Sequence, residues 1–361
     1  EKELAEISRR LQSGGNQVFG QFNSLDIAAL QSRLQDTTLI EYFAVDDKIA
    51  AFVLTENQLR VYENLADVRA VKDELRQFLF QIKTGRFIEK LNADNRRTAV
   101  SRAISHSRKL HSLLVAPVER HRKNSRLTIV PFGALHYLPF QSLHDGERFL
   151  VEKYGISYAP SAAILNTALH RKSVGTKSAL LVGISDRFAP AVKMEIKRLG
   201  DLFEHSAALV NRRATLKNLK AMCGAFDIVH LACHGKFRPD NPLFSALEMA
   251  GENLTAAEAR ELDLADKLVV LSACETGLNR VEDGEELLGL TRGFWSAGAT
   301  SLVLSLWTVN DATTQKLMVD FYTNLRGGSR PAQALRQAQI SILRENPHPF
   351  FWSPFVSSGH Y

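Results

Sequence analysis

Hydrophobic and polar positions in the first part of the chain follow two periods. Short runs alternate between apolar and polar residues, with turn residues between them, at 39–45, 50–55 and 58–62. Runs with the helical spacing of apolar residues flank them at 3–12, 25–34, 68–87 and 97–115. The pattern predicts an antiparallel meander with amphipathic helices before and after it.

Further along, the apolar runs are continuous rather than alternating. We predict buried strands at 126–130, 155–158, 179–184, 226–233, 268–272 and 300–306, and a small hairpin at 244–249. Helical runs lie between or after them at 160–169, 192–203, 255–262, 310–325 and 331–344. Continuous apolar strands alternating with helices are typical of a parallel sheet covered on both faces. The sequence therefore predicts the α/β class, with a mostly parallel sheet flanked by helices.

Chain length bounds the number of structural units. Single hydrophobic cores stop growing at about 250–300 residues, and this chain has 361. We therefore expect two halves or two abutting domains, divided at the polar stretch Ser173–Lys177. Residues 1–36 are interpreted as a helical lead-in, 37–172 as the first half and 173–361 as the second. Because Glu1 is not a methionine and helical spacing follows at once, we expect the lead-in to continue from an upstream region.

Composition argues against a membrane protein. Hydrophobic residues make up 45% of the chain and charged residues 23%, and no apolar run approaches the roughly 20 residues that span a bilayer. Three cysteines (Cys223, Cys233 and Cys274) are too few for a disulfide framework, which fits a reducing compartment. With no signal peptide at the start of the sequence, we predict a soluble, cytoplasmic protein.

The net charge of +6 is concentrated between Arg86 and Arg126. A basic helix face can meet nucleic acid or an acidic protein. However, Phe87 is the only aromatic residue of this run that could stack on a base. We interpret the run as a solvated helix face and expect no direct binding of nucleic acid.

Two predicted strands end in residues that can carry out nucleophilic chemistry. FDIVHLAC (226–233) leads into His234 and Gly235, and LVVLS (268–272) leads to Cys274. A right-handed crossover would lay these strands side by side, with their carboxyl ends at one crevice. A neighbouring imidazole makes a thiol nucleophilic, and a glycine N–H can approach and stabilise an oxyanion. We predict His234 as general base, Cys274 as nucleophile and Gly235 as oxyanion donor.

Neighbouring residues allow other interpretations. Strand alternation puts Cys233 on the opposite face from His234, so we interpret Cys233 as a core thiol. His230 lies deeper in the strand and is interpreted as a core histidine with a hydrogen-bond partner. His230 and His234 also form H-x-x-x-H, but this spacing binds zinc on a helix, and no Glu follows the first His. We expect no metal.

A cysteine-dependent phosphatase is a rival hypothesis. Residues Cys274–Arg280 fit C-x-x-G-x-x-R, the phosphate-binding loop of tyrosine phosphatases. Ala273 before the cysteine and Val281 after the arginine depart from that pattern. The acidic run that follows would also repel a phosphate dianion. We rank this hypothesis below the peptidase.

Several segments resemble the CHAT domain, a caspase-like peptidase module found mainly in bacteria, often behind tetratricopeptide repeats, and grouped with caspases, separase and gingipains. They are HLACHG (230–235), LTAAEA (254–259), VVLSACETG (269–277), GLTRGFWSAGATSLVLSLWTVND (289–311), QALRQAQ (333–339), HPFFWSPFV (348–356) and, upstream, VPFGALHYLPFQSL (130–143) and YGISYAPSAAIL (154–165). The ending FVSSGHY departs from the resemblance, because it is more polar than is usual in the family.

The resemblance implies a caspase-like fold with a degenerate N-terminal half and an active C-terminal half. It implies a cysteine endopeptidase with a His234–Cys274 dyad and no cofactor, which acts on a protein substrate. It also implies control by upstream tetratricopeptide-type repeats and a role in regulated proteolysis or bacterial defence. The alternative within the same fold is an inactive binding or scaffold module.

Substrate selection has its own candidates. In caspase-like peptidases, the loop after the first strand and the segment after the strand that follows the cysteine line the substrate pocket. The resemblance assigns these to Ser185–Arg187 and Leu306–Asp311, with the acidic loop Glu282–Glu286 nearby. Asp186 or Asp283 could then select a basic residue by charge pairing. The competing interpretation is that both are ordinary solvated carboxylates.

Overall fold

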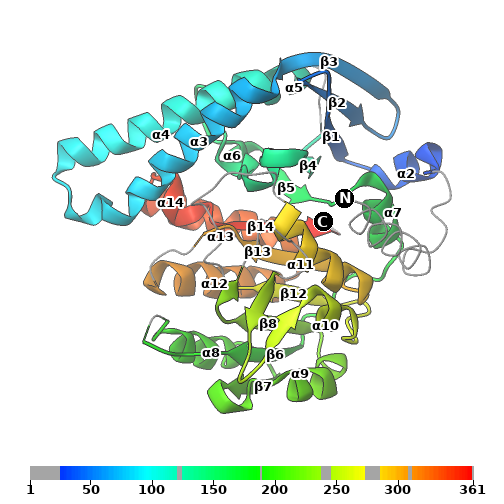
Figure 1. Ribbon diagram of the computed structural model, residues 1–361, viewed down its shortest axis with the longest axis vertical. Coiled ribbons are helices and arrows are strands. Elements are labelled where there is room, and N and C mark those ends of the chain that lie inside the picture. The colour runs from blue at the N-terminus through cyan, green and yellow to red at the C-terminus, as the bar shows by residue number, and fades with distance from the viewer. Residues whose placement is uncertain are drawn as a thin grey trace, which may run out of the picture.

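The computed structural model describes residues 25–119, 124–187, 189–236, 245–272, 285–307 and 311–359. They form an eleven-stranded sheet of order β3-β2-β1-β4-β5-β14-β13-β12-β8-β6-β7 and a three-stranded sheet of order β11-β10-β9. Helices lie on both faces of the large sheet (Figure 1). The predicted α/β class with a mostly parallel, helix-covered sheet is confirmed.

The first block of the large sheet contains the predicted meander. Its strands are β1 (Thr37–Val45), β2 (Lys48–Leu54), β3 (Leu59–Asp67), β4 (Arg126–Val130) and β5 (Gly155–Tyr158). β1, β2 and β3 pair antiparallel, whereas β1 pairs in parallel with β4, and β4 with β5.

The second block is parallel throughout. Its strands are β6 (Ser178–Gly183), β7 (His205–Val210), β8 (Ile228–Ala232), β12 (Leu268–Leu271) and β13 (Ser301–Ser305). The order β13-β12-β8-β6-β7 places the two strands with the candidate chemistry, β8 and β12, next to each other. Every residue of β8, β12 and β13 is buried, as expected of a sheet covered on both faces.

One strand joins the two blocks and reverses the sheet direction. β14 (Phe355–Gly359) pairs antiparallel with β13 and in parallel with β5. The parallel strands of the first block therefore run opposite to those of the second. This polar ending was not predicted to be a strand. Its serines are nevertheless buried, and Ser358 Oγ donates to the Tyr158 carbonyl at 3.0 Å.

Helices make the outer layers. On one face of the second block and the junction lie α8 (Val192–Gly200), α12 (Asp311–Arg326) and α13 (Pro331–Glu345). On the other lie α7 (Ala162–Leu169), α10 (Ala256–Arg260) and α11 (Glu285–Ser296) (Figure 1). The remaining α-helices are α2 (Ile27–Leu34), α3 (Val68–Thr84), α4 (Ala93–Leu114), α5 (Ala116–Glu119), α6 (Leu150–Lys153), α9 (Leu216–Met222) and α14 (Pro349–Trp352).

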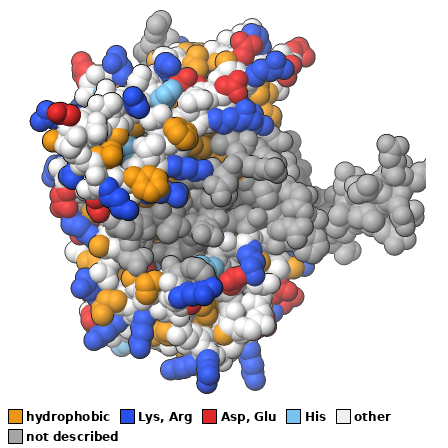
Figure 2. Space-filling model, turned by 60° about the vertical axis from the view of Figure 1, so that its left-hand side comes forward, with side chains coloured by type: hydrophobic (Ala, Val, Ile, Leu, Met, Phe, Trp, Pro, Cys, Tyr) orange, Lys and Arg blue, Asp and Glu red, His pale blue; other side chains and the backbone are white. Residues whose placement is uncertain are grey.

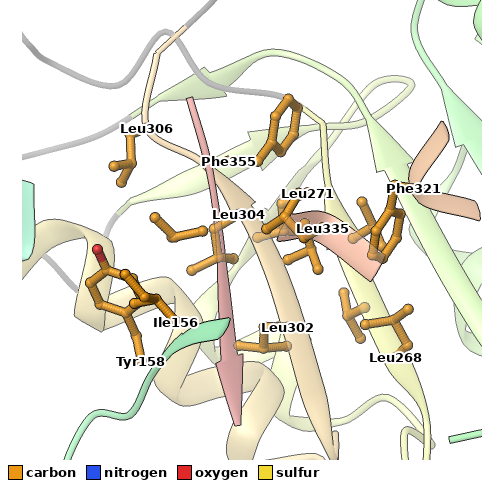
Figure 3. Close-up of a cluster of buried hydrophobic side chains, with 14 of the residues drawn as sticks. Ile156, Tyr158, Leu268, Leu271, Leu302, Leu304, Leu306, Phe321, Leu335 and Phe355 are labelled. Atoms are coloured by element: carbon orange, nitrogen blue, oxygen red, sulfur yellow. The ribbon is translucent and has the colours of Figure 1, made fainter. Parts of the chain in front are cut away.

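A single hydrophobic cluster runs through both halves, from Ile40 in β1 to Val356 in β14. Its central part, around β13, is drawn in Figure 3, which shows Leu302 and Leu304 of β13 together with Phe355 of β14. Burying one such side chain contributes roughly 1.5–3 kcal/mol. The shared core ties the halves together, and the boundaries at 36 and 172 stay predictions.

The small sheet holds the segment that follows β8. It consists of β9 (Gly235–Lys236), β10 (Ala246–Glu248) and β11 (Asn253–Thr255), with β10 antiparallel to both neighbours. The predicted hairpin at 244–249 is therefore part of a three-stranded unit.

None of the helices in the described ranges has the length and apolarity to cross a membrane.

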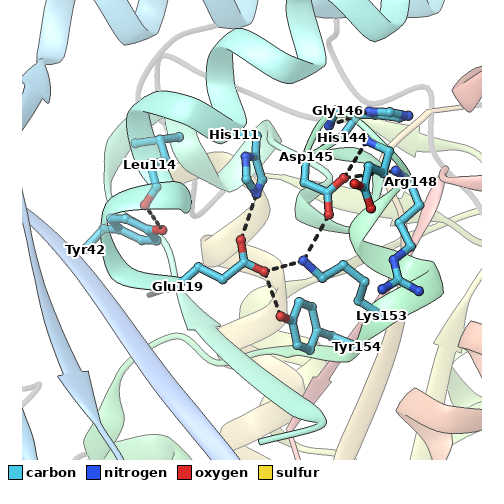
Figure 4. A network of polar contacts seen from close by, with 11 residues as sticks. Tyr42, His111, Leu114, Glu119, His144, Asp145, Gly146, Arg148, Lys153 and Tyr154 are labelled. Atoms are coloured by element: carbon cyan, nitrogen blue, oxygen red, sulfur yellow. Dashed lines mark hydrogen bonds and ion pairs between the residues drawn. The ribbon is translucent and has the colours of Figure 1, made fainter. Parts of the chain in front are cut away.

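A partly buried polar network fastens the end of α5 to α4 and α6 (Figure 4). Glu119 Oε1 accepts from Lys153 Nζ at 2.6 Å and from the Tyr154 hydroxyl at 2.7 Å, and its Oε2 lies 3.3 Å from His111 Nε2. The contact with His111 is the largest influence lowering the pKa of Glu119, and Lys153 and Tyr154 lower it further, against burial. The ionised form of Glu119 is thus stabilised by folding.

Glu119→Gln is expected to lower the free energy of unfolding by about 2 kcal/mol at pH 7. Because folding lowers the pKa of Glu119, its stabilisation is complete above the unfolded value of about 4.3 and is lost as the pH falls toward the folded value. The difference between wild type and variant should therefore shrink between pH 5 and pH 3.5, as measured by urea unfolding.

Glu63→Gln, a change at an exposed carboxylate of β3, serves as the control for this stability series. A wild-type-to-variant difference for Glu119→Gln that stays constant from pH 7 to pH 3.5 would contradict the account of the network.

Candidate active site

The strands that were predicted to carry the chemistry are adjacent. β8 and β12 pair in parallel with Leu231 opposite Leu271, and the Ser272 N–H donates to the Leu231 carbonyl at 2.9 Å. The pairing thus continues to the last described residue before the candidate nucleophile. The prediction that the crossover brings these strand ends together is confirmed.

Two of the predicted site residues, Cys274 and Asp283, lie outside the described residues, as does Arg280 of the phosphatase motif. Their roles stay predictions. The described part of the site consists of the end of β8, the end of β12 and the loop that follows β6.

Beyond the end of β8, the backbone of His234 is hydrogen-bonded to the small sheet. Its carbonyl accepts from the Glu248 N–H at 2.8 Å, and Gly235 then pairs with Leu247 of β10. In an antiparallel ladder this bond makes Gly235 and Leu247 a non-hydrogen-bonded pair. The Gly235 N–H therefore points away from β10 and does not pair with it.

The His234 imidazole faces a carboxylate from the loop that follows the neighbouring strand β6. Its Nε2 lies 3.1 Å from Asp186 Oδ2, and the Asp186 Oδ1 accepts from the Ala189 N–H at 2.9 Å. The side chains of His234 and Asp186 are 27% and 40% exposed, so the pair remains open to solvent. From the sequence, Asp186 was a candidate only for substrate selection.

Strand order explains this contact. β6 is the other parallel neighbour of β8, and the Ile184 N–H donates to the Ala232 carbonyl at 3.0 Å. Asp186 and His234 each lie two residues beyond that bond, at the same edge of the sheet. The contact depends on the pairing of β6 with β8, which the sequence alone does not give.

The Asp186 contact also defines the chemistry open to the imidazole. A carboxylate only accepts, so the proton between the two groups belongs to His234 Nε2. Nδ1 is then the basic nitrogen, free of the carboxylate. The arrangement can take up and return a proton at Nδ1 while Asp186 fixes the ring.

Cys233 and His230 both lie in the core, as strand alternation predicts for Cys233 and depth in the strand for His230. Cys233 is 4% exposed, and burial raises the pKa of its thiol to about 12. His230 is fully buried, and its Nδ1 lies 2.9 Å from the Tyr322 hydroxyl of α12. Within the described ranges, no three His, Cys, Asp or Glu side chains are placed to bind a metal ion.

Comparison with solved structures defines the fold class. Separase in the separase–securin complex of Saccharomyces cerevisiae superposes with a TM-score of 0.61 over 92% of this chain and 30% of that chain, at 11% identity. A second structure of the same complex has a TM-score of 0.58, at 10% identity. The molecule therefore has the separase-type, caspase-like fold.

Sequence comparison defines the family. The CHAT domain profile matches residues 105–360, and the chain belongs to the CHAT domain family. Tetratricopeptide repeat protein 28 of Homo sapiens is 26% identical over 70% of this chain, and that of Mus musculus is 25% identical over the same share. The chain spans only 13% of the length of either relative.

Cys233 should resist alkylation in the folded chain, because its thiol is buried and its pKa is raised to about 12. Treatment with iodoacetamide at pH 7.5, followed by mass spectrometry of peptides, should show modification of Cys233 only after unfolding in urea. The buried Cys223 provides an internal comparison. Modification of Cys233 in the folded chain at the rate seen in urea would show that its core assignment is wrong.

Proposed function

We propose that this chain is a cysteine endopeptidase in which His234 is the general base and Cys274 the nucleophile. The observation that carries the proposal is the parallel pairing of β8 with β12, which continues to Ser272. Cys274 follows Ser272 by two residues, so their Cα atoms are at most about 7 Å apart. His234 likewise follows Ala232 by two residues. Adjacent strands lie about 4.8 Å apart, so the two side chains are within reach.

The reaction begins with transfer of the Cys274 thiol proton to Nδ1 of His234. The thiolate attacks the scissile carbonyl, and the N–H groups of Gly235 and Cys274 bind the oxyanion. When the tetrahedral intermediate collapses, the C–N bond breaks and His234 gives its proton to the leaving amine. Water, deprotonated by His234, then attacks the thioester. This step releases the acid and restores the thiol.

We assign Asp186 the role of orienting His234. Both oxygens of the Asp186 carboxylate have partners: Oδ1 accepts from the Ala189 N–H, and Oδ2 faces the His234 imidazole. This geometry supports a role in orienting His234 over a role in selecting a charged substrate. A carboxylate that holds the imidazole also stabilises the imidazolium formed during the reaction. The pocket role of Asp283 stays a proposal.

The biological setting is proposed on the family resemblance. A protein is the expected substrate, and the names of the mammalian relatives support an association with upstream tetratricopeptide repeats. A cytoplasmic location is proposed from the small number of cysteines, and a role in bacterial defence rests on the resemblance alone. The separase likeness supports the fold and does not extend to the substrate.

Cys274 should be the thiol that iodoacetamide modifies fastest near neutral pH, because His234 is expected to favour its thiolate. In His234→Ala, the modification of Cys274 at pH 6.5 should slow at least tenfold. His205→Ala, at an exposed position of β7, is the matched control. Equal modification in wild type and His234→Ala would support the inactive binding module.

Cleavage itself is tested with the full-length protein and candidate partners encoded near its gene. A partner should be cut by the wild type and left intact by Cys274→Ala. If no partner is cut, the peptidase proposal fails. Hydrolysis of p-nitrophenyl phosphate that is lost in Arg280→Ala would instead establish the phosphatase.

Asp186→Asn should lower kcat on a cleaved partner about tenfold with little change in KM, because the amide no longer fixes the His234 ring. Steady-state kinetics against Asp201→Asn, an exposed carboxylate of the same half, provides the comparison. A higher KM with unchanged kcat, together with lost preference for a basic residue, would return Asp186 to the substrate pocket.

A further inference from the structure

A buried carboxylate lies beneath the ends of β8 and β12 and is not used in the proposed mechanism. Glu195 of α8 is 7% exposed, and its neighbours in the apolar stripe of the helix are Ile196 and Leu199. A buried carboxylate is costly unless it is hydrogen-bonded and paired. Its position within an apolar stripe therefore indicates a specific role.

The contacts of Glu195 link both candidate strands. Its Oε1 accepts from Ser272 Oγ at 3.0 Å, and the same oxygen lies 3.3 Å from Nε2 of the fully buried His230. The His230 Nε2 does not form a hydrogen bond with this oxygen. The hydrogen bond to Glu195 Oε1 therefore comes from Ser272 Oγ. Ser272 is also the last described residue before Cys274 and lies two positions ahead of it.

The other ring nitrogen of His230, Nδ1, is contacted by a residue of α12. The Tyr322 hydroxyl lies 2.9 Å from His230 Nδ1 and is itself fully buried. Burial is the main cause that raises the pKa of Tyr322 well above its usual value, and Glu195 raises it further. Tyr322 therefore stays protonated and can donate to Nδ1, which leaves the proton of His230 on Nε2, facing the carboxylate.

α8 is held close enough to the sheet for this contact by a glycine. A Cβ on Gly183, at the end of β6, would lie 2.7 Å from Val192 Cγ1 and 2.9 Å from Ile196 Cγ1. Only a residue without a side chain allows α8 to pack so closely on β6. The helix thereby brings Glu195 beneath β8 and β12.

We propose that Glu195 is a positioning residue for the nucleophile. Its carboxylate accepts from Ser272 Oγ and faces Nε2 of His230, whose ring is fixed by Tyr322, so the end of β12 is linked to β8 through Glu195. The anchor acts on Ser272, which precedes Cys274 by two residues in the sequence. The inference rests on the proposed function, because it concerns the placement of the Cys274 thiol beside His234.

The test is the pH dependence of iodoacetamide modification at Cys274, measured by peptide mass spectrometry in this chain. Positioning predicts that Glu195→Gln and Ser272→Ala raise the midpoint of the profile by about one pH unit, toward the ordinary thiol value of about 8.5. At pH 6 this corresponds to about tenfold slower modification. Ser272→Thr, which keeps the hydroxyl, should restore the wild-type midpoint.

The sign of the shift separates positioning from a simple charge effect. Removing a negative charge near a thiolate would by itself lower the midpoint, because the thiolate would be repelled less. A lower midpoint in Glu195→Gln, or no shift in either variant, therefore overturns the inference. Glu204→Gln, at an exposed site just beyond α8, is the charge control, and melting temperatures establish that each variant is folded.

The wild-type profile distinguishes failure of the positioning role from failure of the proposed function. A wild-type midpoint well below 8.5 that the variants do not raise overturns the positioning role and leaves the peptidase intact. A wild-type midpoint near that of an ordinary thiol overturns the proposed function and this inference together.

Discussion

The candidate site depends on the parallel pairing of β8 with β12. Since both strands are fully buried, each residue keeps a fixed face and register, and a slip of one position would turn every side chain to the opposite layer. This register puts Cys233 and the fully buried His230 in the core and carries His234 past the strand end. The same pairing brings Ser272 above Glu195. Local sequence supplies the reactive groups, and the sheet determines which of them meet.

The reversal of direction at β14 places the carboxyl ends of the two blocks at opposite edges of the sheet. Parallel strands gather their carboxyl ends at one edge, and the first block runs opposite to the second. The carboxyl ends of β4 and β5 therefore lie at the other edge from His234. The first block contributes to the stability of the fold, through the shared core and through networks such as that around Glu119.

Much of the fold follows from the hydrophobic pattern, and the exceptions have physical causes. The continuous apolar runs predicted β6, β8, β12 and β13 because these strands are covered on both faces. The edge strand β7 is mostly solvent-facing and lacks that pattern. β14 is central but contains serines, which find hydrogen-bond partners such as the Tyr158 carbonyl. A buried polar strand of this kind is not visible to an apolar pattern.

The site residues likewise divide into those that the sequence could predict and those that depend on contacts between distant segments. His234, Gly235 and Cys274 could be proposed from the sequence because each follows an apolar run at a strand end. The contact of Asp186 with His234 joins residues 48 positions apart, and it depends on strand order, which the sequence does not state. Glu195 carried a local signal, a charge within an apolar helix stripe, but its partner Ser272 is 77 positions away.

The most direct test of the central claim is the distance between His234 Nδ1 and Cys274 Sγ in a crystal structure of the chain. The account predicts a separation of about 4 Å or less, with Nε2 still at the Asp186 carboxylate. A thiol directed into the core, or an Nδ1–Sγ distance beyond about 7 Å that persists when a cleaved partner's peptide is bound, would contradict the dyad.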